Sequence, residues 1–79
     1  MNLAEAPLGK WLKIAAVGGE RSFRRRLLEL GLLPGCRIRV LRIAPLGDPL
    51  ELVARGANLS IRAQEARQIV VEPAVESVA

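Results

Sequence analysis

The sequence predicts a mainly β domain, a small barrel of about five strands with one α-helix inserted after the first strand. The chain has 79 residues, which is enough for one domain with one small core. Several short segments alternate apolar and polar residues, with the period of two that is typical of strands. Only one segment repeats its apolar residues with the period of a helix.

The predicted core is aliphatic, because 51% of the residues are hydrophobic and only 3% are aromatic. Apolar content this high argues against disorder. No run approaches the roughly 18 consecutive apolar residues of a membrane helix. The N-terminal residues lack both the basic and the apolar region of a secretory signal. We therefore expect a cytoplasmic protein without membrane insertion.

The first predicted strand covers residues 10–17 and follows a lead-in anchored by Leu3. Period-two alternation places Leu12, Ile14 and Ala16 on one face of this strand. Two glycines then interrupt the pattern, so we expect the strand to end there.

The predicted helix covers residues 20–30. Phe23, Leu27 and Leu30 follow one another at i, i+4 and i+7, which gives a narrow apolar stripe for the core. Leu28 lies away from this stripe, among arginines.

The residues directly after the predicted helix indicate both where the helix ends and where the chain reverses its direction. Gly31 suits the position after the last helical residue, because glycine adopts a positive φ without a Cβ clash. Leu32 would then pack back on Leu27. Pro34 and Gly35 suit the two central positions of a type II turn.

The second predicted strand covers residues 36–44. Its apolar residues alternate up to Val40, but Leu41 and Ile43 then fall on the opposite face. Either a bulge re-aims the strand, or the strand buries both faces where it bends around a barrel. We expect the bend.

The remaining predicted elements are short. They are a loop at residues 45–49 with Gly47, strands at 50–55 and 59–62, a hairpin turn at 56–58 with Gly56, a helical turn at 63–66, and a closing strand at 67–72 with Ile69 and Val71 inward. A sheet this small avoids exposed edges by curling. The expected architecture is a small SH3-like β-barrel over residues 1–73, with a frayed tail at 74–79.

The net charge of +4 is consistent with an anionic partner, which could be nucleic acid, a membrane surface or an acidic protein. The arginines concentrate in two segments: Arg21, Arg24, Arg25 and Arg26, then Arg37, Arg39 and Arg42. Proteins that bind single strands combine such charges with stacking aromatic residues, and this chain has only Trp11 and Phe23. We therefore favour a solvated helix face or a docking face over nucleic acid binding.

Three stretches carry a family resemblance: RRLLELGLLPG (residues 25–35), APLGDP (44–49) and RAQEARQIVVE (62–72). In this order and spacing they resemble the FeoA family, ferrous iron transport protein A, over roughly residues 8–72. The resemblance implies a cytoplasmic SH3-like barrel without catalysis of its own. It also implies that the chain acts with FeoB, the membrane ferrous-iron transporter with a cytoplasmic GTPase domain, and is recruited by it to the inner face of the membrane.

The residue types offer little for chemistry. The chain has no histidine to act as acid, base or metal ligand, and a lone cysteine, Cys36, which we interpret as a small buried hydrophobe. Ferrous iron prefers imidazole and carboxylate ligands, whereas Asp48, Glu51 and Glu65 have no ligand-like spacing. We expect no enzyme activity, no cofactor and no metal site in the sequence, although transition metal binding is a term associated with the family.

The candidate contact residues are exposed apolar groups and their charged neighbours: Arg24, Arg25, Leu28, Pro45, Leu46, Asp48 and Pro49. Ordinary barrel packing could account for them, as could a contact with the transporter or self-association.

Two alternatives for function remain open. One is a small basic barrel that binds nucleic acid, and the other is a detached regulatory domain of a metal-responsive repressor, whose DNA-binding winged helix this chain lacks.

Overall fold

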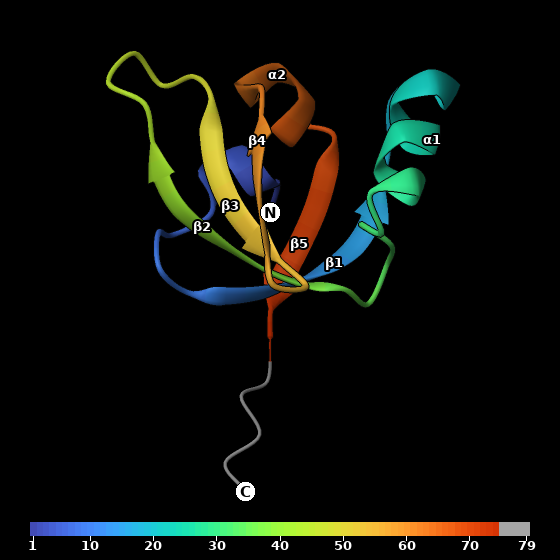
Figure 1. Cartoon of the computed structure of the whole chain (residues 1–79), viewed down its shortest axis with the longest axis horizontal. Coiled ribbons are helices and arrows are strands. Elements are labelled where there is room, and N and C mark those ends of the chain that lie inside the picture. Colours follow the sequence, from blue (N-terminus) through green and yellow to red (C-terminus); the bar gives the residue numbers. More distant parts are fainter. Residues whose placement is uncertain (75–79) are drawn as a thin grey trace, which may run out of the picture.

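The computed structural model describes residues 1–74, which form one curved antiparallel sheet with helices at its margins (Figure 1). The strands are β1 (Trp11–Val17), β2 (Arg37–Ile43), β3 (Leu50–Ala54), β4 (Ala57–Ile61) and β5 (Ile69–Pro73). The helices are the 3-10 helix η1 (Leu3–Glu5) and the α-helices α1 (Arg21–Glu29) and α2 (Ala63–Ala66). The strand order is β4-β3-β2-β1-β5. The predicted mainly β class, with a helix after the first strand, is confirmed.

The core is aliphatic, as predicted, and contains no buried polar or charged residue among those described. All five strands contribute to it: Leu12, Ile14, Ile38, Val40, Leu50, Leu52, Ala54, Ile61, Ile69 and Val71. Leu3 of η1 is fully buried and anchors the N-terminal lead-in. Burial of each large aliphatic side chain stabilises the fold by about 1.5–3 kcal/mol, which makes this shared interior the main source of stability.

Strand β1 changes its inward face after Ile14. Its pairing register with β5 shifts between Ile14 and Ala16. As a result Ala16 is exposed, while Val17 packs half-buried against the core. The prediction that Ala16 shares the buried face is wrong, because one extra residue in a strand reverses which side chains point inward.

Strand β2 also contains a register shift, between Val40 and Arg42 in its pairing with β3. Leu41 and Ile43 are 42% and 37% exposed. The predicted bend with both faces buried is therefore wrong, and the alternative of a bulge is correct. The bulge keeps Val40 inward and leaves the residues after it on the outside.

The end of α1 is the predicted glycine cap. Gly31 has a φ of +83°, its N–H donates to the C=O of Leu28 at 3.0 Å, and the N–H of Leu32 donates to the C=O of Leu27 at 2.8 Å. This pair of bonds defines a Schellman motif. Leu32 is buried, whereas Leu30 is 47% exposed. The prediction that Leu30 faces the core is wrong, because the chain leaves the helix there and Leu32 occupies the interior instead.

The turn after α1 also follows the prediction. The N–H of Cys36 donates to the C=O of Leu33 at 2.9 Å, and Gly35 between them has a φ of +93°, as a type II turn requires. The N–H of Gly35 donates to the C=O of Ile14 at 2.7 Å, which ties the turn to β1.

The hairpin between β3 and β4 is tighter than predicted. Ala54 pairs with Ala57, so the loop is Arg55 and Gly56, with φ values of +54° and +78°. Two positive φ values in a two-residue loop define a type I′ turn. The predicted turn at 56–58 is wrong, because Arg55 adopts a conformation that is uncommon for residues other than glycine.

The C-terminal part of the domain matches the sequence closely. Helix α2 covers the predicted helical turn, and Ile69 and Val71 of β5 are buried. Strand β5 continues to Pro73, and the N–H of Ala74 donates to the C=O of Trp11 at 3.2 Å. Residues 75–79, where most of the frayed tail was predicted, lie outside the described residues.

Candidate docking surfaces

The candidate contact residues lie on two separate surfaces. Arg24, Arg25 and Leu28 belong to α1, whereas Leu46 and its neighbours form the loop between β2 and β3. Figure 1 shows α1 and this loop on opposite sides of the molecule, with α2 between them in the view. A single flat interface therefore cannot cover both surfaces at once.

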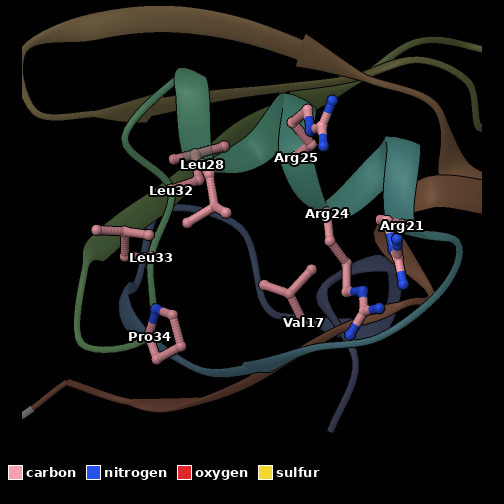
Figure 2. Close-up of a pocket in the computed structure, with 8 residues that line it drawn as sticks. All are labelled: Val17, Arg21, Arg24, Arg25, Leu28, Leu32, Leu33 and Pro34. Carbon is pink, nitrogen blue, oxygen red and sulfur yellow. The ribbon is translucent and has the colours of Figure 1, made fainter.

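The first surface is a groove of about 390 Å³ beside α1, called here the α1 groove (Figure 2). Three structural elements contribute to it: the end of β1, the exposed side of α1 and the turn that follows α1. Its lining residues are Val17, Arg21, Arg24, Arg25, Leu28, Leu32, Leu33 and Pro34.

The local structure of the chain explains why the floor of the α1 groove is apolar. Leu27 is directed into the core, so its neighbour Leu28 lies roughly 100° around the helix and is 57% exposed. The Schellman motif and the type II turn bring Leu33 and Pro34 back beside the helix. Leu33 is also 40% exposed. Apolar side chains separated in the sequence thus meet in one concave surface.

The rim of the α1 groove is positively charged. Within residues 1–74, no carboxylate oxygen lies within 4.0 Å of the guanidinium of Arg21, Arg24 or Arg25. Their neighbour Arg26, on another side of α1, forms a salt bridge with Glu65. Figure 2 shows Arg24 extending from α1 toward the side of the groove where Val17 lies. Among the arginines of α1, the three that line the groove thus form no salt bridge within the described residues.

The second surface is the tip of the β2–β3 loop. Leu46 is 96% exposed, and the loop closes through a hydrogen bond from the N–H of Gly47 to the C=O of Ala44 at 2.7 Å. Gly47 has a φ of +84°, which favours glycine at this position. The turn therefore holds an apolar side chain in solvent, flanked by Pro45 and Pro49.

Asp48 has partners within the chain that sequence reasoning did not identify. Its Oδ1 accepts a hydrogen bond from the N–H of Ala63 at 3.0 Å, and its Oδ2 lies 3.9 Å from Nη1 of Arg62. The residue at the N-cap of α2 is Arg62, which cannot accept a hydrogen bond from a helix N–H. The lack of an acceptor side chain at this N-cap was the one signal in the sequence that a distant residue would cap α2.

Two of the three arginines of β2 lie over the ring of the single tryptophan. The guanidinium carbons of Arg37 and Arg39 lie 5.3 and 4.8 Å from the ring centroid of Trp11. Cation–π contacts of this kind compete with base stacking on the same ring. The tryptophan is thus already engaged within the chain.

On the outer surface, Arg42 and Glu51 form a salt bridge across β2 and β3. The hydrogen bond from Arg42 is the main reason why the pKa of Glu51 lies below its usual range. The same bond raises the pKa of Arg42. Both groups are exposed, so this pair is screened by solvent.

Metal-ligating side chains are dispersed in the part of the chain that the structure describes. Residues 1–74 contain no cluster of three or more Cys, Asp or Glu side chains that could hold a metal ion. Cys36 is half-buried and packs against the core. Among residues 1–74, no helix is both long enough and apolar enough to cross a membrane.

The fold and its surfaces define a small β-barrel domain with an apolar, arginine-rimmed groove and an exposed apolar loop tip. The family model of the FeoA domain matches residues 1–73. The chain is also 39% identical over 72 residues to the Fe(2+) transport protein A/Fe(2+) transporter FeoB fusion protein of Porphyromonas gingivalis. This match covers 91% of the chain but 8% of the fusion protein. The chain belongs to the FeoA family.

Two solved structures resemble the domain over nearly its whole length. The FeoA protein from Chlorobium tepidum is 40% identical with a TM-score of 0.88, over 99% of this chain and 75% of that chain. The Stenotrophomonas maltophilia FeoA, complexed with zinc and described as a procaryotic SH3 domain protein, is 30% identical with a TM-score of 0.78, over 91% and 89%. The predicted SH3-like barrel is confirmed.

Proposed function

We propose that this chain is a non-enzymatic accessory protein of ferrous iron uptake that docks on the cytoplasmic side of a FeoB-type transporter. The observation that carries this proposal is the Porphyromonas gingivalis relative, in which the matching segment shares one polypeptide with FeoB. Covalent linkage raises the effective concentration of one part at the other. Such a fusion is advantageous when the two parts act in contact.

The structure supports a role carried by surfaces. We propose two exposed apolar features as the contact surfaces for docking, the α1 groove and the loop tip at Leu46. In many complexes a few side chains that become fully buried near the centre of the interface supply most of the binding energy. The chain regulates the transporter only if it binds one conformation of the transporter more tightly than another. The Stenotrophomonas maltophilia relative has been put forward as a ferrous iron transport activating factor.

The test is affinity capture of the purified full-length FeoB from the same organism, in detergent micelles, by the immobilised chain. We expect the wild type to retain the transporter. The Leu46→Asp variant should fold normally, because Leu46 is 96% exposed, and should retain less transporter. Full retention by the folded variant would remove the loop from the contact. No retention by the wild type would overturn the proposed function.

A cellular measurement complements the capture. Deletion of the gene for this chain, with the transporter left intact, should slow growth on limiting ferrous iron. Expression of the wild-type chain should restore growth. Unchanged growth and unchanged ferrous uptake in the deletion strain would contradict a role in iron uptake.

A further inference from the structure

We propose that the α1 groove is the docking site for an acidic amphipathic segment of the transporter's cytoplasmic part. The segment would present one or two large apolar side chains to the groove, flanked by Asp or Glu. The identity of the partner rests on the proposed function, whereas the chemistry of the segment is inferred from the groove itself.

The apolar floor sets the first requirement on the occupant. Leu28, Leu33 and Pro34 gather in one concavity of about 390 Å³, a volume at the lower end of the range of about 300–1,000 Å³ for binding pockets. Leu28 is the most exposed leucine of the three that line it, at 57%. A flat bilayer surface would not fill a concave site, whereas projecting side chains of a folded partner would.

The charges on α1 set the second requirement. Arg21 is the first residue of α1, and no acidic residue occurs in its first turn, although cations at a helix N-terminus oppose the helix dipole. Arg21 and Arg25 are also spaced at i and i+4, where like charges destabilise a helix by roughly 0.2–0.5 kcal/mol. Glu20 at the N-cap and Glu29 at i+4 from Arg25 belong to the same helix. Within the described part of the chain, however, no carboxylate oxygen lies within 4.0 Å of the guanidinium groups of Arg21, Arg24 and Arg25.

An acidic partner would reduce both the unfavourable charge at the start of α1 and the repulsion between Arg21 and Arg25. Carboxylates at the rim of the α1 groove would pair with Arg21, Arg24 and Arg25 and would also interact favourably with the positive end of the α1 dipole. Local features that destabilise a fold without an internal compensation often mark functional sites. Charge complementarity therefore favours an acidic segment over a neutral or basic one.

Two other occupants fit the groove less well. Nucleic acid phosphates would pair with the arginines but would leave the floor at Leu28 and Leu33 without apolar contacts. A second copy of the chain would offer Leu46 as an apolar anchor, but the nearby Asp48 is already bonded to Ala63 and close to Arg62.

The experiment measures the affinity of full-length FeoB from the same organism, in detergent micelles, for Leu28→Asp and for the matched control Leu30→Asp. Both positions lie at the C-terminal end of α1 and are similarly exposed, at 57% and 47%, so an added carboxylate meets the same helix dipole. Only Leu28 lines the α1 groove. We expect Leu28→Asp to weaken binding at least about tenfold, as for an interface hot spot, and Leu30→Asp to change it less than about twofold.

The charge requirement has its own pair of variants. Arg24→Glu should weaken binding severalfold at low salt, whereas Arg24→Lys should retain most of the affinity because it retains the charge. The difference in affinity between these two variants should shrink at high salt, since exposed charges are screened.

Circular dichroism verifies that each variant folds. If Leu28→Asp does not fold, Leu28→Gln replaces it.

The outcomes separate this inference from the proposed function. Equal affinities of the wild type, Leu28→Asp and Leu28→Gln would overturn the groove assignment and leave docking intact, whereas absence of wild-type binding would overturn both. Two further controls use vesicles with anionic phosphatidylglycerol and a single-stranded oligonucleotide. If Leu28→Asp and Arg24→Glu abolished binding to either of these, or dissolved a homodimer, without changing the affinity for FeoB, the acidic-segment assignment would be wrong.

Discussion

Asp48 caps a helix that begins 15 residues further along the chain: its Oδ1 accepts a hydrogen bond from the N–H of Ala63 at 3.0 Å. Ala63 is the first residue of α2, whose N-cap is Arg62. The N–H groups of the first helical turn have no partner within a helix, and Glu65 supplies a second acceptor by bonding back to the N–H of Arg62 at 3.2 Å. The cap thus fixes the β2–β3 loop against α2.

We predict that Asp48→Ala lowers the free energy of unfolding by about 0.5–2 kcal/mol, the usual effect of removing a capping side chain. Asp48→Asn retains an acceptor oxygen and should lose less than half as much. Urea denaturation followed by circular dichroism measures both values. Equal losses for the two variants would show that the charge, and not the hydrogen bond, matters at this position.

The glycine cap of α1 gives a second prediction. Gly31 has a φ of +83°, and a Cβ there would lie 3.4 Å from Cδ of Arg55. A left-handed conformation costs a residue with a Cβ roughly 1–2 kcal/mol. We predict that Gly31→Ala lowers the free energy of unfolding by about this amount, measured by urea denaturation.

Gly18→Ala is the matched control for the glycine cap. Gly18 lacks a positive φ, and its added Cβ would make an ordinary contact, 3.5 Å from the carbonyl oxygen of Gln68. We expect no loss of stability or a slight gain, because alanine restricts the unfolded chain more than glycine does. A loss at Gly18 as large as at Gly31 would contradict the role of backbone conformation.

The metal chemistry of the isolated chain gives a third prediction. Residues 1–74 contain no cluster of three potential ligands among Cys, Asp and Glu, and the whole sequence has no histidine. Anaerobic calorimetry with ferrous ion should therefore show only weak binding at surface carboxylates. Stoichiometric binding in the micromolar range would refute this expectation and would direct attention to ligands shared between copies of the chain.

The sequence by itself determined the local features of this protein. Period-two alternation located the strands, Gly31 located the end of α1, and Pro34 with Gly35 specified the turn that follows. These features depend on the conformational preferences of single residues and near neighbours, which any sequence displays. Exposure of Leu28 was also predictable, because it lies beside the apolar stripe of its own helix.

Only the tertiary structure decided the bulges and the surfaces. Whether Ala16 and Leu41 face inward depends on register with neighbouring strands, because a bulge in one strand is stabilised by the pairing of both. The α1 groove likewise needs β1, α1 and the following turn to converge, and the cap between Asp48 and Ala63 joins residues that no spacing rule connects. Contacts between distant segments form only when the common core brings those segments together, so local patterns could not reveal them.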